Sequence, residues 1–124
     1  MHTKMIKYHN DNTPYIVAEV RKGFAGINTS DDILDIIGEV GIKECSRVII
    51  HSESFSKDFF DLRSGLAGEI LQKFSNYRMK LAIIGDFSDL KSRSWRDFIR
   101  ESNRGRRVNF VKSVEEAIAS LTNK

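Results

Sequence analysis

The sequence contains very little cysteine and proline, and the shortage of cysteine excludes a class of protein. Among the 124 residues there is one cysteine, Cys45, and one proline, Pro14. A lone cysteine cannot form a disulfide within the chain, which argues against a disulfide-stabilised secreted domain and leads us to expect a cytoplasmic protein. Cys45 matches no signature that pairs it with a histidine, so a small, partly buried side chain is favoured over a nucleophile.

Long apolar runs and a strong excess of one charge are also missing. No apolar run approaches the roughly 20 residues that span a bilayer, and residues 1–5 lead into a strand pattern rather than the hydrophobic region of a signal peptide. The formal net charge is only +3, although the isoelectric point is about 9.1. That charge is too small to indicate nucleic-acid binding by itself. We therefore expect neither a membrane nor a nucleic acid as the partner.

The sequence does contain enough apolar side chains for one hydrophobic core. Hydrophobic residues make up 40% and charged residues 30% of the chain, and no linker divides it, so residues 1–124 are predicted to form a single domain. Predicted strands cover residues 5–9, 15–20, 48–50, 81–85 and 108–111. Ser30 is predicted to cap the first helix. The other predicted helices begin between residues 58 and 61, at Ser92 or Ser94, and at Ser113, where Glu116 would complete a capping box.

This order, β-β-α-β-α-β-α-β-α, predicts an α/β domain with a mixed sheet. The first two strands flank the polar turn that contains Pro14 and should pair as an antiparallel hairpin. Each later strand is reached through a helix, so these strands should run parallel, with right-handed crossovers. If successive strands are neighbours, the crossover helices lie on one face of the sheet and the hairpin forms an antiparallel edge.

The segment from Phe59 to Leu71 indicates where function should lie. Leu62, Leu66, Ile70 and Phe74 recur every fourth residue and predict the buried stripe of one helix. The loop before this helix follows a buried strand, and such loops at the carboxyl ends of parallel strands are where α/β proteins bind ligands. The free N–H groups of a helix start also attract anions, including a phosphate carried on a serine.

An acid, a serine and a glycine occupy this junction. The candidate switch or partner site is therefore Asp58, Asp61, Ser64 and Gly65. The alternative is structural, because Asp58 or Asp61 could cap the helix while Ser64 lies in its first turn.

A second group of polar residues follows the neighbouring strand ends. His51, Ser54 and Asp86 form a candidate ligand rim, and together with Asp58 and Asp61 they could bind a divalent metal or perform acid–base chemistry. The alternative is a polar rim that caps helices and satisfies loop amides. Because no metal-ligand spacing such as His-x-x-x-His occurs, we expect no metal and no cofactor, and we assign no catalytic residue.

Arginines recur at three- and four-residue spacing on the third helix. Arg93, Arg96, Arg100 and Arg104, joined by Arg106 and Arg107, form a candidate anion-binding stripe for phosphates or an acidic partner. The alternative is a solvated helix face on which Asp97 and Glu101 supply ion pairs.

The second half of the chain resembles a bacterial family described as domain of unknown function 4180. The resemblance rests on Phe59-Phe60-Asp61-Leu62, on residues 65–77, on Leu81-Ala82-Ile83-Ile84-Gly85-Asp86-Phe87, on Arg96-Asp97-Phe98-Ile99 and on Glu101-Ser102-Asn103. It implies no particular activity.

A weaker resemblance, at the level of the fold, is to STAS domains of the anti-sigma-factor-antagonist type. In those domains an Asp-Ser-Ser-Gly loop leads into a helix, and a serine of the loop is phosphorylated by a partner kinase. Here Asp61-Leu62-Arg63-Ser64-Gly65 is similar but has one extra residue between the acid and the glycine. The resemblance implies a STAS-like fold, with Ser64 as the counterpart of the phosphorylated serine.

These observations lead to one preferred function and two alternatives. We expect a single STAS-like α/β domain that acts as a non-enzymatic regulatory module and binds a protein partner, a second copy of the chain being one candidate. The first alternative is a small-molecule or metal-binding enzyme with its site at His51, Asp61 and Asp86. The second is polyanion or nucleic-acid binding through the stripe from Arg93 to Arg107.

Overall fold

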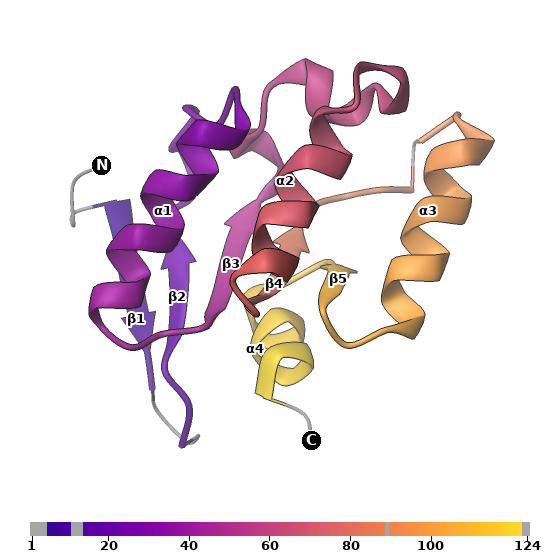
Figure 1. The fold of residues 1–124 in the computed structure, drawn as a ribbon. Coiled ribbons are helices and arrows are strands. Elements are labelled where there is room, and N and C mark those ends of the chain that lie inside the picture. The colour runs from indigo at the N-terminus through magenta and orange to yellow at the C-terminus, as the bar shows by residue number, and fades with distance from the viewer. Residues whose placement is uncertain (1–4, 11–13, 89, 123–124) are drawn as a thin grey trace.

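One mixed β-sheet with helices on both faces forms the protein (Figure 1). The computed structural model describes residues 5–10, 14–88 and 90–122. The strands are β1 (Ile6–His9), β2 (Val17–Val20), β3 (Arg47–His51), β4 (Lys80–Ile84) and β5 (Val108–Val111), and the α-helices are α1 (Ser30–Ile42), α2 (Leu66–Asn76), α3 (Arg93–Arg104) and α4 (Val114–Thr122). Three short 3₁₀ turns join β3 to α2: η2 (Ser52–Ser54), η3 (Lys57–Phe60) and η4 (Leu62–Ser64). The predicted order of strands and α-helices is confirmed.

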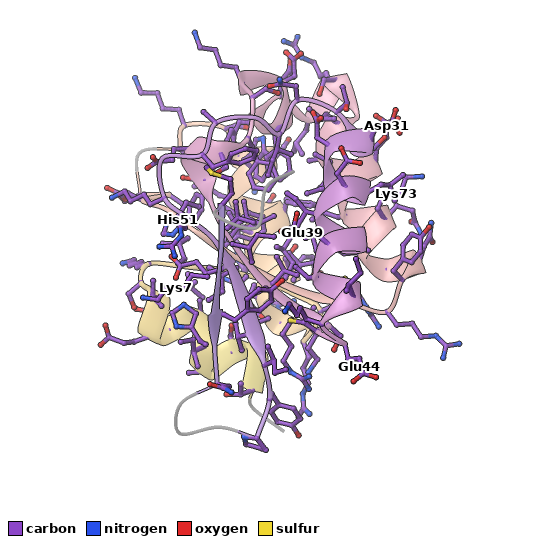
Figure 2. All side chains as sticks on the ribbon, turned by 90° about the vertical axis from the view of Figure 1, so that its left-hand side faces the viewer. Lys7, Asp31, Glu39, Glu44, His51 and Lys73 are labelled. Atoms are coloured by element: carbon purple, nitrogen blue, oxygen red, sulfur yellow. The ribbon has the colours of Figure 1, made fainter. Side chains whose placement is uncertain are left out.

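The sheet has the order β1-β2-β3-β4-β5. Strand β1 pairs antiparallel with β2, with Ile6 opposite Val20, and the remaining neighbours pair parallel. Because β2 to β5 lie side by side in chain order, right-handed crossovers place α1, α2 and α3 on one face. Helix α4 follows the last strand and packs on the opposite face, against β3, β4 and β5. Figure 2 shows α4, in yellow, across the strands from α1.

Alternation along the strands divides the buried side chains into two clusters. In β2, Ala18 and Val20 face the three-helix layer, whereas Val17 faces the side of α4. The larger cluster includes Ile70 and Phe74 of α2, both fully buried. The smaller cluster lies beneath α4. None of the helices formed by the described residues has the length and apolar character needed to cross a bilayer.

Helix α1 is capped by Thr29, and the prediction of Ser30 as the cap is wrong. The Asp32 N–H donates to Thr29 Oγ1 over 3.3 Å, and the Asp32 carboxylate accepts from the Thr29 N–H over 3.0 Å. This reciprocal pair needs a side chain that can accept a hydrogen bond three residues after the cap. Asp32 stands at that spacing from Thr29, whereas Ile33 stands there for Ser30.

Helix α2 begins at Leu66, several residues later than the predicted start within 58–61. The intervening residues form η3 and η4 instead, and Gly65, with a φ of +79°, separates η4 from the helix. Leu62 therefore lies outside the helix and is only half-buried. The rest of the predicted stripe is buried as expected: Leu66, Ile70 and Phe74.

The last two helices are capped by serines that the sequence analysis proposed. Ser92 Oγ accepts from the Trp95 N–H, so Ser92 rather than Ser94 caps α3. Ser113 Oγ accepts from the Glu116 N–H over 3.1 Å. The predicted return bond differs, because the Glu116 carboxylate accepts from the Lys112 N–H instead of the Ser113 N–H.

Candidate functional site

The segment between β3 and α2 contains Asp61, one of the residues of the predicted switch. Its carboxylate accepts from the Arg63 N–H over 3.0 Å and pairs with Arg63 Nε over 3.2 Å. These bonds, first the side-chain bond and then the backbone bond, lower the pKa of Asp61 below its ordinary value. Asp61 therefore caps η4, which agrees with the structural alternative for this residue. The capped turn is η4 and not the long helix.

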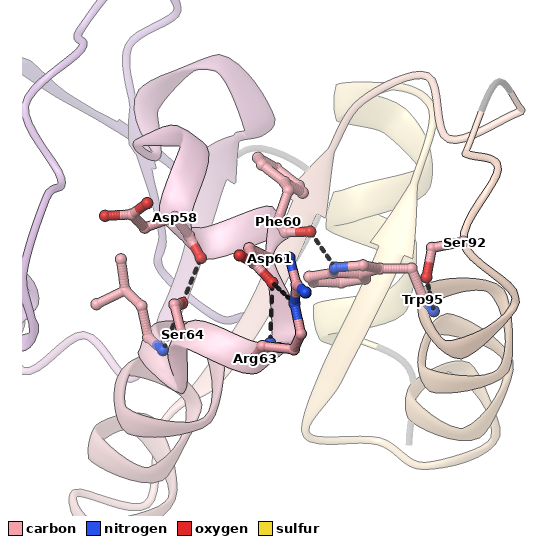
Figure 3. A network of polar contacts seen from close by, with 8 residues as sticks. Asp58, Phe60, Asp61, Arg63, Ser64, Ser92 and Trp95 are labelled. Atoms are coloured by element: carbon pink, nitrogen blue, oxygen red, sulfur yellow. Dashed lines mark hydrogen bonds and ion pairs between the residues drawn. The ribbon is translucent and has the colours of Figure 1, made fainter.

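Ser64 joins two parts of the same segment (Figure 3). Its hydroxyl donates to the backbone carbonyl of Asp58 over 2.6 Å and accepts from the Leu66 N–H over 3.2 Å. The residue is exposed and lies in η4, just before α2. It does not lie in the first turn of the helix. The residue is thus exposed, while its hydroxyl holds η3, η4 and the helix start together.

Gly65 has a backbone conformation that favours glycine, so Gly65→Ala should be destabilising. At φ +79° an added Cβ meets no atom within 4 Å, and the cost arises from the left-handed backbone alone, about 1–2 kcal/mol. The matched control is Gly68→Ala, inside α2, where a Cβ also meets nothing within 4 Å but the φ is not left-handed. That change should stabilise the protein by up to about 1 kcal/mol. Urea unfolding measures the change in the free energy of unfolding for both variants. Changes of the same sign would contradict the left-handed conformation of Gly65.

A groove separates this segment from α3. Its volume is about 400 Å³, and it is lined by Phe60, Asp61, Leu62, Arg63, Ser92, Ser94 and Trp95. The Trp95 indole N–H donates to the carbonyl of Phe60 across the floor of the groove (Figure 3). Beneath it, the rings of Phe59 and Trp95 lie 5.8 Å apart and belong to a larger aromatic cluster. The segment is therefore held to α3 through Phe60, while Arg63 projects into solvent.

His51 has a partner that sequence reasoning missed. Its Nε2 lies 2.7 Å from Oε2 of Glu19, and His9 Nε2 lies 2.8 Å from Oε1 of the same carboxylate. Glu19 is 9% exposed and His51 is 7% exposed. The three side chains join β1, β2 and β3 on the face of the sheet that also bears α4. Figure 2 shows His51 on that side, away from α1.

The chemistry of this cluster follows from its hydrogen bonds. An ionised carboxylate only accepts, so each imidazole must donate from Nε2. Burial opposes ionisation of Glu19, but the hydrogen bonds and charges of His51 and His9 outweigh it and lower the pKa of Glu19 below its ordinary value. Among the described residues no group of three His, Cys, Asp or Glu side chains is arranged to hold a metal ion. The sequence did contain an indication that Glu19 has a buried partner, because this acid interrupts the apolar strand Val17-Ala18-Glu19-Val20.

His51 and Asp86 of the predicted ligand rim bond to residues outside it. No hydrogen bond or ion pair of the described residues joins His51 to Asp58, Asp61 or Asp86. Asp86 accepts from the hydroxyl and the N–H of Ser88, which lower its pKa. Ser54 is 1% exposed, and its hydroxyl has no partner among the described residues. His51 therefore bonds to the buried Glu19 and not to these aspartates, and a shared ligand rim stays a prediction.

The arginine stripe lies on the exposed side of α3, as its spacing indicates. Asp97 pairs with Arg100 at 3.1 Å and with Arg93 at 4.0 Å, and Glu101 pairs with Arg104 at 3.7 Å. Side chains in these pairs are between 51% and 88% exposed, so each pair contributes little to stability. Arg96 donates to the carbonyl of Leu90. The predicted ion pairs with Asp97 and Glu101 are confirmed.

Comparison with known proteins identifies the family. The family of the domain of unknown function DUF4180 matches residues 12–121. The chain belongs to this family, which confirms the resemblance drawn from its sequence. No curated protein and no solved structure matches it.

Proposed function

We propose that the protein is a regulatory protein-interaction module of the anti-sigma-factor-antagonist type, and that its partner binds the segment from Ser52 to Ser64 and the groove beside α3. The observation that supports this most directly is the position of Ser64. It is exposed at a helix start, yet its hydroxyl donates to the carbonyl of Asp58 over 2.6 Å. A modification of this oxygen would break that hydrogen bond and would therefore change the conformation of the whole segment.

A phosphate on Ser64 would act through this contact. Esterification removes the hydroxyl proton, so Oγ no longer donates to the Asp58 carbonyl, and two electron-rich groups would then face each other at 2.6 Å. The start of α2 would stabilise the phosphate, since the Leu66 N–H already donates to Ser64 Oγ over 3.2 Å and the N-terminal end of a helix favours negative charge. The turn η3 would have to move away, and it includes Phe60, whose carbonyl holds Trp95. Both walls of the groove would change together.

The test uses a protein partner captured from the native host with the wild-type chain. Ser64→Asp should release this partner at least tenfold more readily than Ser64→Ala, because only the aspartate adds negative charge beside the Asp58 carbonyl. Ser75→Asp, on the exposed face of α2, is the matched control for charge and should retain the partner. Titration by surface plasmon resonance measures the three affinities. Equal affinities for Ser64→Asp and Ser64→Ala would contradict the proposal.

A further inference from the structure

The two outer helices of the three-helix layer carry opposite charges. Between Ser30 and Ile42, α1 has four acidic residues and no basic one. Between Arg93 and Arg104, α3 has four arginines and two acids, and Arg106 and Arg107 follow at once. Helix α2 lies between them, and α1 and α3 form opposite ends of the layer (Figure 1). These surfaces cannot meet within one molecule.

The charges on α3 exceed what its own acids neutralise. Asp97 is shared by two arginines, and among the residues that the structure describes the guanidinium of Arg96 pairs only with the carbonyl of Leu90. On α1, the side chains of Asp31 and Asp35 are exposed and make no hydrogen bond or ion pair with the described residues. Both faces therefore present unneutralised charge of opposite sign, the arrangement that directs specific association between protein surfaces.

The outer face of α1 has further features that suit close contact. Gly38 and Gly41 are exposed, and a Cβ built on either meets no atom within 4 Å, so neither glycine is needed for packing inside the molecule. Glycine costs a helix about 1 kcal/mol relative to alanine. Ile42, at the end of the helix, is 82% exposed. One exposed side of the helix, at spacings of three and four residues, carries Asp31, Asp35, Gly38 and Ile42, which we call the α1 stripe.

We propose that this stripe of α1 docks on the arginine face of α3 in a second copy of the chain, so that the protein assembles head to tail. The helices match in length, since 13 and 12 residues both span about 18–20 Å. Arginine stems would cover Ile42, while the guanidinium groups meet Asp31 and Asp35. Because each copy uses two different surfaces, the contact is heterologous and can extend into a ring or a chain. A contact between two helices that depends on exposed charges is weak, and it weakens further as the salt concentration rises.

Sedimentation velocity with a charge-swapped pair tests this proposal. The wild type should show concentration-dependent sedimentation at about 20 mM salt and sediment as a monomer at about 0.5 M, where charges are screened within about 4 Å. Arg96→Glu with Arg100→Glu, and separately Asp31→Lys with Asp35→Lys, should each remain monomeric at low salt. An equimolar mixture of the two variants should associate, because it restores an acidic α1 opposite a basic α3.

Two controls separate a specific contact from general charge attraction. Glu53→Lys with Glu115→Lys, both exposed and outside α1 and α3, produces the same net charge as the α1 variant and should still self-associate. Circular dichroism verifies that each variant is folded, and Arg100→Gln with Arg104→Gln replaces the α3 variant if that one unfolds. A wild type that is monomeric at low salt, a mixture that stays monomeric, or an α1 variant that associates as the wild type does would each overturn the proposal.

Discussion

Replacing Ile70 by alanine is expected to lower the free energy of unfolding by about 2–5 kcal/mol. Ile70 is fully buried on the inner face of α2, within the cluster between the helix layer and the sheet. Deleting its outer methylene and methyl groups removes contacts on all sides and leaves a cavity that close-packed neighbours fill only in part.

Ile42→Ala is the matched control for this change, because it is the same substitution on an α-helix at a side chain that is 82% exposed. It should change the stability by no more than about 0.5 kcal/mol. Urea unfolding at high salt, followed by circular dichroism, measures both variants without interference from association. A similar cost for the two substitutions would show that α2 does not pack as described.

Replacing Glu19 by alanine is expected to cost about 1–3 kcal/mol, because it leaves the buried imidazole of His51 without its acceptor. The substitution removes the 2.7 Å contact between His51 Nε2 and Glu19 Oε2 and the 2.8 Å contact between His9 Nε2 and Glu19 Oε1. The cost should shrink when His51→Leu is already present, since only the more exposed imidazole of His9 then loses its acceptor. A double-mutant cycle measures this coupling, expected to be about 0.5–3 kcal/mol. Additive effects would mean that the two residues do not interact.

The same residue should contribute to acid sensitivity. The folded-state pKa of Glu19 lies below its ordinary value of 4.5, so the unfolded chain binds a proton more readily. Its contribution to stability is therefore fully present above pH 4.5 and is lost as the pH falls through the folded-state pKa. Glu19→Gln removes this titration while preserving the shape of the side chain. The difference in unfolding free energy between wild type and Glu19→Gln should decrease below that pH, and a difference that grows there would contradict the argument.

The order of the elements and the composition of the main core could be predicted from the sequence. Short apolar strands alternating with amphipathic helices determine an α/β order, because each pattern depends only on residues close together in the chain. The stripe of Leu66, Ile70 and Phe74 was found in this way. The helix start was not, because the left-handed backbone of Gly65 ends the 3₁₀ turn η4 before the helix begins, and the same sequence pattern also allows an earlier start.

The pairing of polar residues was decided by the tertiary structure. Local spacing directed attention to His51 with Asp61 and Asp86, yet His51 bonds to Glu19, which lies 32 residues away in the chain. That contact exists only because β2 and β3 are neighbours and because alternation turns both side chains to the face that bears α4. Similarly, α1 and α3 carry their charges in the sequence, but the sheet order places them at opposite ends of one layer. Local patterns thus determine which elements form, and contacts between distant strands determine which side chains meet.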